Sequence, residues 1–234
     1  MPSPFVILTA LKEELAAVQP AIGAKSHVTL ARGGVGAKAA TAAALKIFQA
    51  NPRPTMICSS GFCGGLNNDL RVGDVVLASR ILDGSGKNSP IDCDAALVAA
   101  WKNALENAKV SVRVGVLVSA ASAVTKCDDK RALGVTNQAC AVDMESYAIA
   151  TQARVAGAAV MALRAVSDSV DDELPAEVGS FLDEAGNVRA ASVAKFAMSH
   201  PRNMKTLWGL KSRSDKAAAG LTAAWKAIGA GWPR

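Results

Sequence analysis

The chain has 234 residues, of which 50% are hydrophobic and only 4% aromatic, and its formal net charge is +6. This length fits one large domain, such as a single α/β domain, or two small ones, and the apolar side chains are sufficient for a core. No apolar run reaches the roughly 18 residues of a membrane span, and the stretch MPSPFVILTALKEEL has no basic n-region, so we expect neither a spanning helix nor a signal peptide. The expected location is therefore cytoplasmic.

The excess of positive over negative charge lies entirely in the C-terminal part of the chain. Residues 1–199 contain 19 basic and 19 acidic residues, whereas residues 200–234 contain seven basic residues and one acidic residue. Because aromatic residues are few and the body is neutral, we do not expect nucleic acid as a partner. Five cysteines without a CxxC spacing, and only two histidines, predict neither a disulfide framework nor a metal site.

Short apolar runs alternate along the chain with longer alanine-rich stretches of helical period. We predict strands at residues 5–9, 27–31, 55–60, 74–79, 110–119 and 158–166, and helices from residue 13 and at 37–50, 94–108 and 146–155. Residues 170–190 are expected to form a long loop before C-terminal helices. This alternation is typical of an α/β domain with a largely parallel, buried sheet.

Ligands in such folds bind beyond the carboxyl ends of the strands. Carboxylates and glycine-rich turns gather at predicted strand ends, at residues 10–14, 33–36, 61–65 and 167–168, and in the stretch VDME. Glu14 precedes an apolar run and can point inward, whereas Glu13 suits a solvated first helical turn. Asp143 and Glu145 share one side of an extended segment, so one can face a site while the other caps the next helix.

Two glycine-rich stretches, RGGVGAKAA and SSGFCGGL, follow predicted strands. The first precedes a helix and can receive an anion on its backbone N–H groups, although it matches neither GxGxxG nor the P-loop. In the second, glycines allow the backbone to approach a ligand closely.

The stretches VILTALKEEL, GGVGAKAA, SSGFCGGLNNDLRVGDVVLAS, AVDMESYAIA and ALRAVSDSVDD occur in an order that resembles the purine and uridine phosphorylase superfamily. They are most similar to its hydrolytic branch, the methylthioadenosine/S-adenosylhomocysteine nucleosidases, over residues 5–172. The resemblance implies a single three-layer α/β/α domain with a mixed, largely parallel sheet. Residues 1–199 would be catalytic, and residues 200–234 would be a basic amphipathic helical segment of the same domain. It also implies a homodimer without a cofactor.

The same resemblance implies a role for each matching residue. Glu14 would activate the attacking water, and Asp168, beside Ser167, would protonate the purine. Met144 would pack beneath the ribose, and Glu145 would bind its hydroxyls with support from Arg164. Further substrate-binding residues would be Val35, Gly64 and Val124.

Carboxylates in these positions suit cleavage of an N-glycosidic bond. A purine leaves poorly as an anion, so an acid must protonate it, while a second carboxylate stabilises the oxocarbenium-like ribose. We therefore predict an N-ribosyl hydrolase that releases adenine from a 5′-substituted adenosine. The alternatives are a phosphorylase, with Arg32, Gly33 and Gly34 as the phosphate site, and a non-catalytic nucleoside-binding protein.

The sequence also departs from the nucleosidase pattern. Phe62 stands where these enzymes usually have a serine, and Ala123 stands where an aromatic commonly stacks on the purine. The segment after Asp168 is similar to the hopanoid-associated nucleosidases, which implies adenosylhopane as the substrate and hopanoid biosynthesis as the setting.

The basic segment 200–234 has two readings. Leu221, Trp225 and Ile228 lie at helical spacing, which predicts packing on the core or on a partner subunit. The alternative is transient contact of this segment with an anionic membrane, which would make the protein peripheral to the inner membrane.

Overall fold

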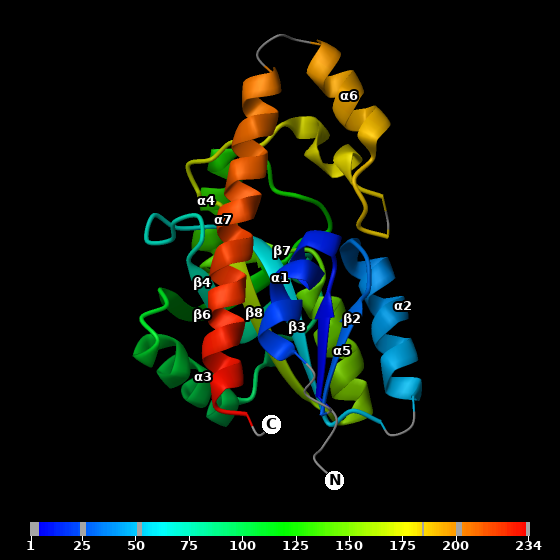
Figure 1. Ribbon diagram of the computed structural model, residues 1–234, viewed down its shortest axis with the longest axis vertical. Helices are drawn as coiled ribbons and strands as arrows, with labels where there is room; N and C mark the ends of the chain where they lie inside the picture. Colours follow the sequence, from blue (N-terminus) through cyan, green and yellow to red (C-terminus); the bar gives the residue numbers. More distant parts are fainter. Residues whose placement is uncertain (1–4, 24–26, 51–52, 184, 200–202, 233–234) are drawn as a thin grey trace.

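The computed structural model describes residues 5–23, 27–50, 53–183, 185–199 and 203–232 (Figure 1). One mixed sheet forms its centre. Its strands are β1 (Phe5–Thr9), β2 (Val28–Arg32), β3 (Met56–Gly65), β4 (Val75–Asp83), β5 (Ile91–Asp92), β6 (Val112–Ser119), β7 (Ala141–Asp143) and β8 (Ala159–Asp168).

The strand order is β2-β1-β3-β7-β6-β4-β5, and β8 pairs with both β3 and β4. The pairs β1–β2, β1–β3, β3–β8, β4–β6 and β6–β7 are parallel, whereas β3–β7, β4–β5 and β4–β8 are antiparallel. The expected mixed, largely parallel sheet is therefore confirmed. Parallel pairing brings the carboxyl ends of β1, β2, β3 and β8 to one edge, and the antiparallel β3–β7 pair places the short strand β7 beside Gly64 and Gly65 of β3.

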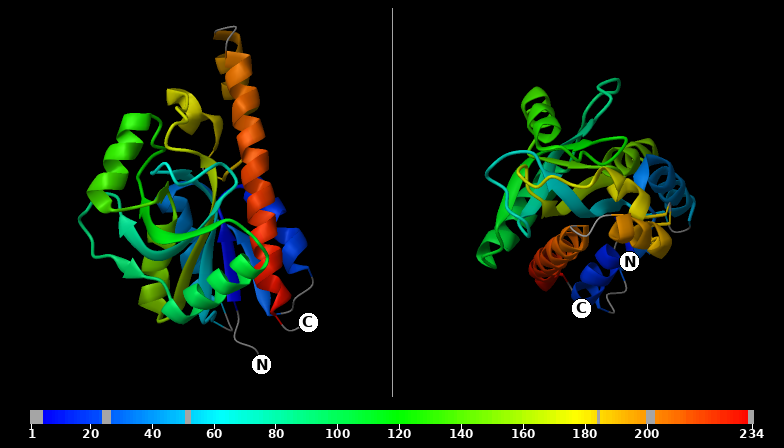
Figure 2. Two further views of the ribbon diagram at one scale, coloured as in Figure 1. Left: turned by 90° about the vertical axis from the view of Figure 1, so that its left-hand side faces the viewer. Right: turned by 90° about the horizontal axis from the view of Figure 1, so that it is seen from above.

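Helices cover both faces of the sheet, which completes the predicted three layers (Figures 1 and 2). On one face α7 (Asn203–Ala230) packs against α1 (Lys12–Ile22) and α3 (Ala95–Asn107), and on the other α2 (Gly36–Gln49) packs against α5 (Ser146–Ala156). The predicted N-cap of α3 is confirmed, since the Asp94 side chain accepts from the Leu97 amide at 2.9 Å.

The second glycine-rich stretch is a strand, not the turn that its glycines predicted. β3 continues through GFCGG to Gly65 and pairs with β8 as far as Asp168, with a register shift at Cys63/Gly64. The glycines serve close packing: a Cβ on Gly64 would lie 3.0 Å from the Asp168 carboxylate. Because glycine has no side chain, β3 can lie close to β8 where β8 ends at Asp168.

The C-terminal stripe packs on the core, as the first of its two readings predicted. Leu221, Trp225 and Ile228 are buried, and the Trp225 indole donates to Ser60 Oγ at 2.8 Å. These three side chains are therefore not on a membrane-facing surface. Near the N-terminus of the same helix, Met204 and Trp208 are exposed. This end of α7 extends beyond the sheet (Figure 1).

Two helices lie where a loop or no element was predicted. The 3-10 helix η1 (Ala176–Phe181) interrupts the expected loop, and α4 (Cys127–Asn137) precedes β7, whereas α6 (Ala190–Ser199) is the first of the expected C-terminal helices. The α4 sequence CDDKRALGVTN has little apolar periodicity, which explains why it was missed. No helix in the described part of the chain is long and apolar enough to span a membrane.

Candidate active site

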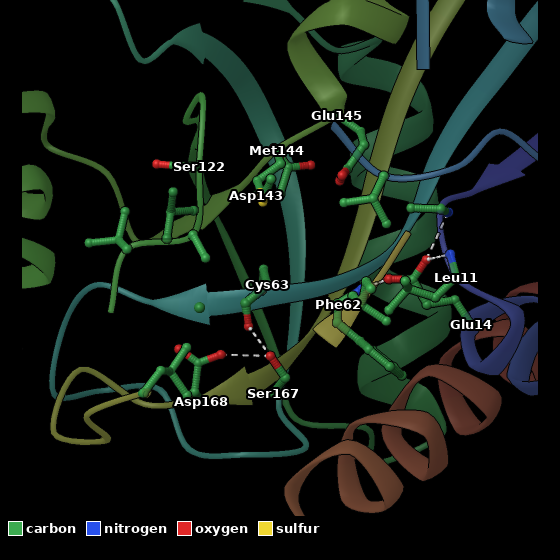
Figure 3. Close-up of a pocket in the computed structure, with 18 residues that line it drawn as sticks. Leu11, Glu14, Phe62, Cys63, Ser122, Asp143, Met144, Glu145, Ser167 and Asp168 are labelled. Atoms are coloured by element: carbon green, nitrogen blue, oxygen red, sulfur yellow. Dashed lines mark hydrogen bonds between the residues drawn. The ribbon is translucent and has the colours of Figure 1, made fainter. Parts of the chain in front are cut away.

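A cavity with about 640 Å³ of empty volume opens at the carboxyl edge of the sheet (Figure 3). Eight of the sequence-predicted site residues line it: Glu14, Val35, Gly64, Val124, Met144, Glu145, Ser167 and Asp168. The remaining lining is mainly apolar and includes Leu11, Phe62, Ala123, Leu174 and Leu182. Residues that are as far apart in the sequence as Ala10 and Leu182 thus meet around one cavity.

Glu14 enters the cavity from the first turn of α1. Its Oε2 accepts from the Ala10 and Leu11 amides at 2.8 and 2.9 Å, and its Oε1 accepts from the Phe62 amide at 2.7 Å. The bond to Leu11 caps the helix in the way of a capping-box glutamate. Burial raises the pKa of the Glu14 carboxyl, and the Arg164 guanidinium and the three amides oppose this rise.

Gly61 makes room for this carboxylate. A Cβ at this position would lie 2.4 Å from Glu14 Oε1 and 2.6 Å from the nearest Arg164 guanidinium nitrogen. Any side chain here would push two buried charged groups apart, so the chemistry of the cavity explains the glycine.

Glu145 lies at the β7–α5 junction, opposite the glycine turn that precedes α2. Its Oε1 accepts from the Gly36 amide at 2.8 Å. The anion that this turn receives is therefore a side chain of the protein itself. Burial, with the nearby Asp143 carboxylate, raises the pKa of Glu145 to about 7, although Arg164 acts in the opposite direction.

Asp143, which also lines the cavity, forms a buried ion pair with Arg164. Arg164 Nη2 lies 2.5 Å from Asp143 Oδ2 and also donates to Ser59 Oγ and Ser146 Oγ. Asp143 thus supports a neighbouring basic residue, and its Oδ2 also accepts from the Ser146 amide at 3.1 Å. Arg164 itself lies beneath the cavity and not in its lining, where its charge offsets those of the buried acids Asp143, Glu145 and Glu14.

Asp168 ends β8 and is held from two sides. Ser167 Oγ lies 2.7 Å from Asp168 Oδ1 and 3.2 Å from the Cys63 carbonyl oxygen. Lys130 Nζ, from α4, lies 2.5 Å from Asp168 Oδ2. Sequence reasoning missed Lys130 because its helix was missed and its partner is 38 residues away. The only local hint of an inward-facing Lys130 is Gly134, which lies one helical turn later on the same face of α4 and is the other buried residue of that helix.

The residues considered for phosphate do not line the cavity. Arg32 is exposed, and its Nη1 donates to Asn187 Oδ1 at 2.8 Å. Gly33 and Gly34 instead border a narrow gap, too small for a water molecule, together with Ser59, Glu145 and Arg164. Among the described residues that line the main cavity there is no lysine or arginine.

Residues 16–197 match the model of the phosphorylase superfamily. Because the match covers most of the chain, the protein belongs to this superfamily and is an enzyme of it. The resemblance seen in the sequence motifs is confirmed at this level.

Individual relatives are more distant. The chain is 27% identical over 177 residues to a 5′-methylthioadenosine/S-adenosylhomocysteine nucleosidase of Exiguobacterium sp., covering 68% of this chain and 75% of that protein. A nucleosidase with the same name from Aeromonas salmonicida is 27% identical over 188 residues, covering 74% and 81%. Neither relative supports the expected link to adenosylhopane and hopanoid biosynthesis.

Solved structures share the fold. The 5′-methylthioadenosine/S-adenosyl homocysteine nucleosidase of Helicobacter pylori, complexed with a pyrrolidin-3-ol compound, superposes with a TM-score of 0.73 at 17% identity, covering 97% of each chain. The futalosine hydrolase of the same organism gives 0.71 at 18% identity, covering 95% of this chain and 97% of that one. The predicted nucleoside phosphorylase-like fold is therefore confirmed.

Proposed function

We propose that the protein is an N-ribosyl hydrolase that cleaves the N-glycosidic bond of a 5′-substituted adenosine and releases adenine. The observation that carries this proposal is the convergence of Glu14, Glu145 and Asp168 on one cavity from three different elements. A protein that only bound a nucleoside would have no need to bury three carboxylates there, because each desolvated charge is destabilising.

Asp168 is the proposed acid for the leaving group. As the bond between C1′ and N9 breaks, its electron pair moves onto the purine, and a proton from Asp168 neutralises the developing charge at N7. The position of Asp168 at the end of β8, beside the hydroxyl of Ser167, supports this role. General acid catalysis of this kind contributes roughly 10²–10⁴-fold in rate.

Glu145 and Met144 are the proposed ribose-binding residues. Glu145 accepts one hydrogen bond from Gly36, and a carboxylate has about four acceptor sites, so lone pairs remain for ribose hydroxyls. Its negative charge would also stabilise the oxocarbenium-like sugar in the transition state.

Glu14 is the proposed base for water. Three backbone amides hold its carboxylate and leave about one acceptor site free. A raised pKa makes Glu14 a stronger base than an exposed glutamate. The side chain of Phe62, rather than the serine usual in nucleosidases, lines the cavity beside it, so Glu14 would orient the water without a hydroxyl from this position.

The charge of the cavity favours water over phosphate as the nucleophile. Phosphate needs cationic or backbone donors, whereas the described lining offers carboxylates and no lysine or arginine. Arg32, the cation considered for this task, is bonded to Asn187 outside the cavity.

Adenine release from 5′-methylthioadenosine, with and without phosphate, tests the proposal. We expect equal rates in the two conditions and free methylthioribose as the second product. A requirement for phosphate, with formation of the sugar 1-phosphate, would instead assign the phosphorylase activity. Asp168→Asn should reduce adenine release by roughly 10²–10⁴-fold while leaving the far-ultraviolet circular dichroism unchanged.

The 5′ substituent and the assembly stay predictions. A substrate panel of adenosine, methylthioadenosine, S-adenosylhomocysteine and adenosylhopane would rank the substituents by kcat/KM. Light scattering on the purified protein would test the expected homodimer, and a monomeric mass would contradict it.

A further inference from the structure

Lys130 is a lysine that is completely buried, with 0% of its side chain exposed. Buried lysines require partners, because an isolated ammonium is expensive to remove from water. Its Nζ has three acceptors: Asp168 Oδ2 at 2.5 Å, the Ser169 carbonyl oxygen at 2.9 Å and the Asp172 carbonyl oxygen at 2.8 Å. All three ammonium protons are therefore used on the segment that carries the proposed acid.

The chemistry of these contacts distinguishes the two carboxyl oxygens of Asp168. An ammonium only donates hydrogen bonds, so a proton on Oδ2 would face another donor. Ser167 Oγ, beside Oδ1, can donate its single proton to the Cys63 carbonyl oxygen and accept from a protonated Oδ1. Only Oδ1 therefore has a neighbour that can receive the acidic proton.

We propose that Lys130 is the positioning residue of the leaving-group acid, which fixes Asp168 through Oδ2 and confines the transferable proton to Oδ1. This inference rests on the proposed hydrolase function. When the proton passes from Oδ1 to the purine and the C1′–N9 electron pair moves onto the base, Asp168 becomes a carboxylate. The Lys130 ammonium then stabilises that charge, so its interaction strengthens as the bond breaks.

Other charged groups near Asp168 have different partners. Asp172 accepts from Ser169 and pairs with Arg213 of α7 at 2.9 Å. Arg164 pairs with Asp143, and the Cys63 thiol is buried with its pKa raised well above the usual value. Lys130 is thus the cation that contacts the Asp168 carboxylate among the described residues.

The neighbouring residue offers a matched control. Arg131, on the same helix, pairs with Asp171 of the same segment, but it is half exposed and does not contact Asp168. Lys130→Met and Arg131→Met each remove one cation between α4 and residues 168–172. Only the first should disturb the acid.

The decisive experiment compares leaving groups. Adenine release from methylthioadenosine needs an acid, whereas the p-nitrophenyl riboside of the same sugar releases p-nitrophenolate without protonation. We expect Lys130→Met to slow adenine release by about 10²-fold and p-nitrophenolate release by less than about 3-fold. Arg131→Met should change either rate by less than about 3-fold, as expected for a surface pair.

Equal losses on both substrates, or equal effects of the two substitutions, would overturn the inference. If Lys130→Met does not fold, the double variant Lys130→Met/Asp168→Asn, which removes both buried charges, replaces it. Compared with Asp168→Asn alone, the double variant should lose less than about a further 3-fold in adenine release, because coupled residues are not additive. A larger loss would overturn the inference, and a wild-type protein inactive on both substrates would overturn the proposed function with it.

Discussion

Replacing Glu145 with glutamine is expected to stabilise the protein at alkaline pH and to change its stability little at acidic pH. The folded protein raises the pKa of Glu145 to about 7 from its usual value near 4.5, chiefly through burial. A raised pKa means that the folded state binds this proton more tightly than the unfolded chain does. The resulting stabilisation is complete below about pH 4.5 and is lost as the pH rises through 7.

The size of the effect follows from the pKa difference. A change of about 2.5 pH units, at 1.36 kcal/mol per unit, corresponds to about 3 kcal/mol in the free energy of unfolding. For a protein of this length it amounts to a rise of roughly 6–12 °C in Tm. Glutamine cannot ionise and keeps an oxygen that can accept from the Gly36 amide, so the variant avoids the loss without leaving that amide unpaired.

The assay is urea or thermal unfolding of both proteins at pH 5.5 and pH 8.5, followed by circular dichroism. The variant should gain about 2 kcal/mol over the wild type between these two pH values, because the unfolded chain has already lost most of this proton at pH 5.5. Glu13→Gln, which removes an exposed carboxylate near the site, controls for the change in net charge. A stability difference that is the same at both pH values, or larger at pH 5.5, would refute the assignment of a protonated, buried Glu145.

The same titration predicts that kcat/KM falls as the pH drops below about 7, because a neutral Glu145 stabilises the ribosyl cation poorly; a flat profile from pH 5.5 to 8 would contradict this. Glu14→Gln should abolish hydrolysis but keep binding of a substrate analogue, as measured by calorimetry, and loss of both would move Glu14 from catalysis to binding. Gly61→Ala should lower both Tm and activity, because its Cβ would lie 2.4 Å from Glu14 Oε1, whereas Gly179→Ala, with no atom within 4 Å, should change neither. The exposed Met204 and Trp208 lie near Lys205 and Lys211 on α7. The protein should therefore sediment with anionic vesicles at low salt, because each engaged lysine contributes ~1 kcal/mol to binding. Equal sedimentation of a Met204→Ser/Trp208→Ser variant would exclude this surface as the membrane contact.

Local sequence patterns predicted most of the sheet and much of the cavity. The apolar runs before Ala10, Gly33 and Asp168 fall on buried or edge strands whose carboxyl ends meet. This meeting follows from parallel pairing alone, so residues far apart in sequence could be expected at one edge. The inward orientation of Glu14 was predictable for a similar reason, since an acid in the first turn can cap its helix from within.

What could not be predicted depends on contacts between distant segments. GFCGG was expected to be a turn because three of its five residues are glycines, which are depleted in strands, yet β8 pairs with residues 61–64. Lys130 lies in a helix with a weak periodic signal, and its inward direction depends on an acceptor in another segment. Arg164 was placed near Glu145, but its ion-pair partner is Asp143, a choice between two acids that only the backbone at the β7–α5 junction decides.

The position of α7 has a consequence for how the protein folds during synthesis. Phe5, on the first strand of the sheet, packs against Trp225, which in turn contacts Trp101. At roughly 5–20 residues per second, a ribosome needs about 10–45 s to make the 220 residues that separate Phe5 from Trp225. Throughout that interval the face of the nascent sheet that α7 shares with α1 and α3 is only partly covered, so the growing chain should depend on chaperones, and a premature stop that removes the end of α7 should yield a product that is degraded rather than a shortened enzyme.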